Sequence, residues 1–107
     1  MIVNFIKKLF TKSPVSDFKN MVEDGAVIVD IRPSIEFSAG HINGSHNIPL
    51  ILMSESIDVL KKLHKPVILV DHTGKRSKWA KNLLSEAGIE AYDGGSWLSL
   101  DQARHVN

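Results

Sequence analysis

The sequence predicts an α/β fold, a small and mainly parallel sheet with helices on both faces. Two continuous, largely β-branched runs, 26–30 and 66–70, predict strands that are buried on both faces. Segments with apolar residues at helical spacing alternate with these runs over short connections. Such alternation is typical of parallel sheets, because parallel neighbours need a crossover connection between them.

The other expected elements are short and separated by turn residues. Helices are predicted from an N-cap at Ser16 to a stop at Gly25, over 35–39, 51–63 and 77–87, and near Trp97 after a turn at Gly94–Gly95; further short strands are predicted over 46–49 and 89–92. In the 51–63 helix, Ile57, Leu60 and Leu63 are expected to face inward. Trp79 is expected to be half-buried against the sheet.

The chain length fits one domain, 1–107. Segment 1–12 is interpreted as an N-terminal extension. It places Ile2, Phe5, Ile6, Leu9 and Phe10 at helical spacing, with two lysines on the other side. The segment is expected to pack on the domain as a helix or strand; the alternative is a surface for self-association or for contact with a partner or a membrane.

Composition excludes several classes of function. The formal net charge of +1 gives no basic face for nucleic acid. The absence of cysteine excludes disulfides, thiolate metal sites and thiol nucleophiles. No stretch approaches the roughly 20 apolar residues of a membrane span, and the N-terminus lacks a signal-peptide pattern. A cytoplasmic location is therefore expected, and no cofactor is predicted.

Two acidic residues end the two buried strands. Asp30 follows the first run and Asp71 follows the second. Ligand sites of parallel sheets lie beyond the carboxyl ends of the strands, so the topology directs both side chains toward the expected site.

The segment that follows the second strand has the character of an anion-binding loop. It consists of Asp71, His72, Thr73, Gly74, Lys75, Arg76 and Ser77. A short loop that leads into a helix N-terminus can direct several backbone N–H groups toward one point. Gly74 permits an unusual backbone angle, and Arg76 adds a cationic fork. Taken alone, the segment is better interpreted as an ordinary strand–loop–helix turn, and only the motifs around it favour the anion-binding interpretation.

Three motifs together resemble the single-domain rhodaneses, the sulfurtransferase family. Segment 29–45 matches the pattern D-x-R-x-x-x-E-[FY]-x-x-G-H-I-x-G-[AS] at each specified position. Segment 74–77 reads Gly-Lys-Arg-Ser and precedes a helix with the family's apolar spacing. Segment 94–97 reads Gly-Gly-Ser-Trp, which is shorter than the family's G-G-x-x-x-W. The resemblance covers about residues 15–97 and implies a rhodanese-like three-layer fold. It also implies that Trp97, at a core position of the family, packs in the interior.

The resemblance also implies what the loop lacks. In active members the loop begins with a cysteine, here at the position of Asp71, whose thiolate becomes a persulfide and passes its sulfur to an acceptor. The spacing from Asp71 to Arg76 matches the sulfurtransferases, whereas the related dual-specificity phosphatases have a loop one residue longer. Asp71 can form neither a persulfide nor a cysteinyl phosphate. The family chemistry is therefore expected to be absent.

Several roles for Asp71 remain open. Its carboxylate could fill the loop's own cradle, which predicts weak or no binding of small oxyanions. It could act as a nucleophile in a transferase or hydrolase of unusual mechanism, as in aspartyl-phosphate enzymes, which normally also bring a metal. A cysteine-to-aspartate substitution introduced into the chain would give the same sequence. The favoured hypothesis is a non-catalytic binding or regulatory module for a protein or a small anionic ligand.

The supporting residues expected around the loop are Asp30, Arg32, Glu36 and His41. Arg76 is expected to pair inward, with Asp71 or Glu36, while Lys75 reaches solvent. His72 is expected to face the mouth of the pocket. No histidine and carboxylate spacing matches a known metal-ligand pattern, so no metal site is predicted.

Overall fold

The computed structural model of the chain describes residues 14–105. In chain order the elements are α2 (Pro14–Glu23), β1 (Val27–Asp30), α3 (Ser34–Ala39), β2 (His46–Asn47), the 3₁₀ turn η1 (Leu50–Leu52), α4 (Met53–Leu63), β3 (Val67–Asp71), α5 (Lys75–Glu86), β4 (Ala91–Ser96) and α6 (Trp97–Arg104). The element predicted within residues 2–10 lies outside the described residues.

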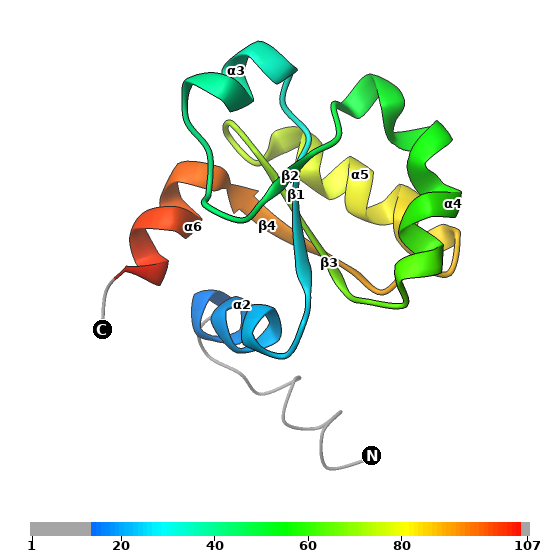
Figure 1. The fold of residues 1–107 in the computed structure, drawn as a ribbon, viewed down its shortest axis with the longest axis horizontal. Coiled ribbons are helices and arrows are strands. Elements are labelled where there is room, and N and C mark those ends of the chain that lie inside the picture. The colour runs from blue at the N-terminus through cyan, green and yellow to red at the C-terminus, as the bar shows by residue number, and fades with distance from the viewer. Residues whose placement is uncertain (1–13, 106–107) are drawn as a thin grey trace.

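The four strands form one parallel sheet in the order β2-β1-β3-β4. Figure 1 shows α2 and α6 on one side of the sheet, with α4 and α5 on the other. This arrangement confirms the predicted α/β fold with helices on both faces.

The central strand β3 explains why the core has two halves. Val67 and Leu69 contribute to the cluster beneath α4 and α5, which also contains Met53, Leu60, Ala80 and Leu84. Ile68 and Val70 point the other way, into the cluster beneath α2 and α6, which also contains Phe18, Ile28, Ile42 and Leu100. Because successive strand residues face opposite sides, a strand covered on both faces must be apolar throughout.

Two predicted helix positions are wrong. The first helix begins at Pro14 rather than after an N-cap at Ser16. Proline is well suited to the first turn, where its missing N–H would have no helical acceptor. Leu63 is exposed rather than inward-facing, because the core side of α4 is formed by Met53 and Leu60, with Ile57 packed beside them.

The placement of Trp79 and the ends of β4 also differ from expectation. Trp79 is 55% exposed, because Ala80 and Leu84 form the buried face of α5. The last strand does not end at Tyr92 but continues to Ser96 through a register shift opposite Leu69 and Val70. Gly94 makes this possible, since a Cβ there would lie 2.8 Å from Ile68 Cγ2.

Candidate functional site

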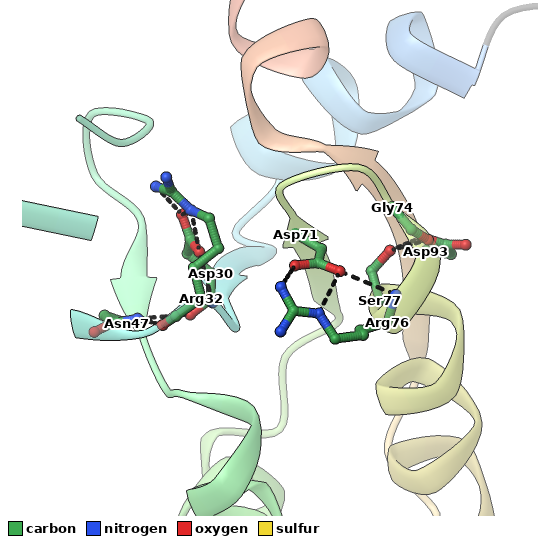
Figure 2. A network of polar contacts seen from close by, with 8 residues as sticks. All are labelled: Asp30, Arg32, Asn47, Asp71, Gly74, Arg76, Ser77 and Asp93. Atoms are coloured by element: carbon green, nitrogen blue, oxygen red, sulfur yellow. Dashed lines mark hydrogen bonds and ion pairs between the residues drawn. The ribbon is translucent and has the colours of Figure 1, made fainter. Parts of the chain in front are cut away.

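The candidate site lies at the carboxyl ends of β1 and β3. These strands are parallel neighbours in which Asp30 is paired with Val70, so Asp30 and Asp71 end adjacent strands. Both carboxylates are fully buried. A buried carboxylate is costly unless it is paired, and each of them has an arginine partner (Figure 2).

Asp30 and Arg32 form a fully buried pair. Arg32 Nε donates to Asp30 Oδ1 at 2.9 Å and Nη2 donates to Oδ2 at 2.8 Å. Nη2 also donates to the Gly40 carbonyl at 2.6 Å, and the guanidinium lies 4.4 Å from the centre of the Trp97 ring. Arg32 therefore joins the end of β1 to the loop after α3 and to the start of α6.

Asn47, at the end of β2, binds the backbone at the end of β1. Its side-chain amide donates to the Asp30 carbonyl at 2.9 Å and to the Arg32 carbonyl at 2.8 Å. Asn47 is not among the site residues predicted from the sequence. Its place in the sequence could have indicated a role at the site. Asn47 ends a short parallel edge strand, and that strand ends beside β1.

Asp71 is enclosed by the first turn of α5. Its Oδ2 accepts the backbone N–H of Arg76 at 2.9 Å and the Arg76 Nε–H at 3.1 Å, and its Oδ1 accepts from Nη2 at 2.8 Å. The carboxylate thus occupies the N-terminal end of α5, where the helix dipole favours a negative charge. Of the two partners expected for Arg76, Asp71 is the one that it contacts.

Opposing influences act on the Asp71 carboxyl. Burial raises the pKa of this carboxyl. Hydrogen bonds lower the pKa; they come from the Arg76 side chain and from the backbone N–H groups of His72 and Arg76. Together with the positive charge of Arg76 they outweigh burial and hold the pKa below its usual value. The hydrogen bond and charge of Asp71 raise the pKa of Arg76 in turn. The loop therefore carries its own ionised carboxylate at neutral pH.

The lowered pKa of Asp71 predicts a defined dependence of stability on pH. Asp71→Asn is expected to reduce the free energy of unfolding by about 1–2 kcal/mol at pH 7, since one charged partner of a half-exposed guanidinium is lost. The stability that ionised Asp71 contributes is complete above the unfolded-state pKa of 3.8 and is lost as pH falls through the lower folded-state pKa. Urea unfolding of both proteins from pH 7 to pH 3 measures this difference, which should shrink toward pH 3; a difference that grows there contradicts the assignment.

Ser77 and Asp93 brace the loop against β4. The Ser77 hydroxyl lies 2.6 Å from Asp93 Oδ1 and 3.0 Å from the Gly74 carbonyl, and the same Asp93 oxygen accepts the Gly95 N–H at 3.0 Å. Gly74 has a φ of +88°, and a Cβ there would lie 3.1 Å from Gly95 Cα, so the close approach favours glycine. Asp93 is not among the site residues predicted from the sequence, although it directly precedes Gly94–Gly95 on the strand β4.

Only some side chains of the predicted loop, residues 71–77, are buried at the candidate site. Within the part of the chain that the structure describes, the side chains of His72, Thr73 and Lys75 are exposed, and Asp71 and Ser77 are buried. The connecting loop is also shorter than predicted, since β3 includes Asp71 and α5 begins at Lys75.

His72, Glu36 and Arg32 line one pocket beside the loop. This pocket has a volume of about 480 Å³ and is completed by Ala39, Gly40, Ser96, Trp97 and Leu98. His72 thus lies at a pocket beside the loop. His41 lies outside the lining and holds the end of α3, where its Nδ1 is 2.7 Å from the Phe37 carbonyl and its ring stacks on Phe37 at 3.8 Å.

Two further observations concern the described residues 14–105. No group of three or more histidine, aspartate or glutamate side chains there is arranged to hold a metal ion. No helix in this range is long and apolar enough to cross a membrane.

Comparisons with known proteins point to one family. A family model described as a rhodanese-like domain matches residues 14–97. Thiosulfate sulfurtransferase GlpE of Pseudomonas fluorescens is 32% identical over 89 residues, which cover 80% of this chain and 81% of GlpE. The uncharacterized protein YibN of Escherichia coli K12 is 35% identical over 84 residues, which cover 77% of this chain. The matched region spans only 57% of the length of YibN.

Solved structures share the fold. A rhodanese-related protein from Thermoplasma volcanium superposes with a TM-score of 0.72 at 22% identity, covering 87% of this chain and 91% of the other. A rhodanese-like domain from Anabaena gives a TM-score of 0.69 at 23% identity, covering 88% of this chain and 74% of the other. At these identities the likeness concerns the fold.

Proposed function

The chain belongs to the rhodanese-like domain family, and on this premise we propose that it is a non-catalytic member that works as a binding or regulatory module. The main support for the proposal is the position of Asp71 and the contacts of its carboxylate. This residue stands where the family resemblance places the sulfur-accepting cysteine, and its buried carboxylate is held by Arg76.

Sulfur transfer requires an atom that can form and break a bond to sulfane sulfur. A thiolate does this by becoming a persulfide, whereas a carboxylate oxygen has no equivalent product. The sequence contains no cysteine that could replace the missing nucleophile. GlpE of Pseudomonas fluorescens is by name a thiosulfate sulfurtransferase, and the same reaction in this chain would need a thiol from elsewhere.

The alternative hypothesis uses Asp71 as an oxygen nucleophile in another transferase or a hydrolase. Both carboxylate oxygens accept hydrogen bonds from Arg76, and the side chain is fully buried. Attack by Asp71 would require the ion pair to break and the loop to open. These contacts favour a structural role for the carboxylate, with recognition through the surface around it.

The thiosulfate–cyanide assay on the wild-type chain tests this proposal. Thiocyanate is expected to form no faster than in the protein-free control, since the reaction lacks a covalent sulfur acceptor. Phosphate and divalent metals added in a thermal-shift series address the hydrolase alternative, and no stabilisation is expected. Thiocyanate formation in proportion to the concentration of wild-type protein would overturn the proposal.

A further inference from the structure

A second pocket opens beside Arg76, and nothing described above uses it. It has a volume of about 370 Å³ and is lined by Ile31, Pro33, Pro49, Leu50, Ile51 and Arg76. We refer to it as the apolar pocket. Its volume falls in the range of ligand sites, and its lining follows their usual pattern of apolar walls with one polar group.

Arg76 lines the apolar pocket and has hydrogen-bond donors that Asp71 does not occupy. Nε and Nη2 donate to the Asp71 carboxylate. Nη1 makes no hydrogen bond to any residue in the range 14–105, and Figure 2 shows this nitrogen without a dashed line. The Arg76 side chain is half-exposed. Because a guanidinium donates only, the atom that pairs with Nη1 must be an acceptor.

Charge at this edge of the sheet favours an acceptor without net charge. The guanidinium of Arg76 is already balanced by Asp71, and the buried arginine at the end of β1 is balanced by its own aspartate. The exposed side chains of Lys75 and Glu36 have opposite signs. A small oxyanion therefore gains little here, whereas a carbonyl oxygen can accept from Nη1 without bringing an uncompensated charge.

The apolar part of the lining indicates what the acceptor is attached to. Ile51 is 87% exposed at the rim, and the two prolines and Leu50 supply rigid or branched apolar walls. A single exposed isoleucine is ordinary, but one that borders an apolar pocket adds area that an apolar ligand can bury. A backbone carbonyl next to an aliphatic side chain is the repeating chemistry of a peptide.

We infer that the apolar pocket binds an aliphatic side chain of a peptide segment from a partner protein, and that a backbone carbonyl of this segment accepts a hydrogen bond from Arg76 Nη1. The inference rests on the proposed function, and it specifies the chemical class of the ligand that the binding module recognises. It places recognition beside the closed loop, at a point that the carboxylate of Asp71 leaves free.

The test uses three acetylated peptides as probes with the wild-type chain. Acetyl-Gly-Leu-Gly-amide carries the aliphatic side chain, acetyl-Gly-Gly-Gly-amide lacks it, and acetyl-Gly-Leu-Gly with a free carboxylate adds a charge. Amide NMR spectra are expected to show saturable shifts at Leu50, Ile51 and the Arg76 Nε–H with the first probe and none with the second. The charged probe is expected to bind no better than the first.

Matched variants locate the site. Ile51→Lys is expected to weaken binding of the leucine probe by about fivefold or more, because apolar contact is lost at the rim. Val59→Lys replaces another exposed aliphatic residue, on the outer face of α4, and should leave binding unchanged. Both sites are exposed, so both variants should fold.

Several outcomes overturn the inference. They are the absence of shifts at the pocket up to the solubility limit of the leucine probe, stronger binding of the charged probe, and an equal loss in both variants. A wild-type dimer in sedimentation that Ile51→Lys abolishes would make a second copy the occupant instead. The thiosulfate–cyanide assay is independent of these results, so failure here leaves the loss of catalysis standing.

Discussion

Asp71→Cys is expected to create thiosulfate sulfurtransferase activity. The loop keeps the sulfurtransferase spacing, the positive φ of Gly74 and the N–H group of Arg76 that now binds the carboxylate. A thiol at this position would lie at the N-terminus of α5 beside a guanidinium, which lowers its pKa and favours the reactive thiolate. Removal of a covalent nucleophile typically costs several orders of magnitude in rate, so a gain on the order of 10³-fold over wild type is expected.

The control for this gain is Asp71→Ser. Serine has nearly the size of cysteine but cannot hold a sulfane sulfur, so thiocyanate formation should remain at the protein-free rate. The two variants remove the same ion pair and differ only in the attacking atom. If Asp71→Cys folds, carries a titratable thiol and still shows no turnover, the chain has lost more of the family site than its nucleophile.

Arg32→Met is expected to have the largest effect on stability. Arg32 is 4% exposed and is the partner of the fully buried Asp30, so its loss leaves an uncompensated charge in the core. Breaking a buried pair in this way costs about 3–5 kcal/mol. For a domain of this size, the Tm should fall by on the order of 15 °C, measured by calorimetry.

A double variant separates the charge from the packing. Adding Asp30→Asn to Arg32→Met removes the stranded carboxylate and should restore part of the stability lost in the single variant. Lys78→Met on the exposed side of α5 is the matched control and should change the free energy of unfolding by less than about 0.5 kcal/mol. If the effects of the two substitutions on the free energy of unfolding are strictly additive, the proposed coupling between Asp30 and Arg32 is contradicted.

The fold class could be predicted from sequence because β3 is covered on both faces. A strand in that position must be apolar at every residue, so Val67 to Val70 are recognisable without knowledge of their neighbours. The candidate site could be proposed because Asp30 and Asp71 end such strands, and parallel strands place their carboxyl ends at one edge.

The remaining differences between the predicted and the observed elements depend on tertiary contacts, which leave no periodic pattern in the sequence. Trp79 fits the apolar pattern of α5, but the small Ala80 and the neighbouring Leu84 form its core face. The extension of β4 past Tyr92 depends on Gly94, whose missing side chain lets the strand lie close to Ile68. Sequence alone favours a turn at paired glycines, and only the packing of β3 shows that the strand continues.

The partner of Arg76 could not be decided from spacing alone. Asp71 and Glu36 were both within reach of the predicted loop, and the structure places the guanidinium on Asp71. The backbone N–H of Arg76 adds a third contact to the same carboxylate, which only the first turn of α5 can provide. The cradle therefore holds the carboxylate of Asp71 itself, which is one of the roles that the sequence left open for this residue.

Calorimetric titration of thiosulfate and of phosphate into the wild-type chain and into Asp71→Ala tests most directly whether the loop is filled by its own carboxylate. The wild type is expected to give no binding heat, because Asp71 already occupies the backbone N–H, the Nε–H and the Nη2 group of Arg76. Asp71→Ala is expected to bind either anion, since the same donors become free at a helix N-terminus. Micromolar binding of thiosulfate or phosphate by the wild type would contradict the account.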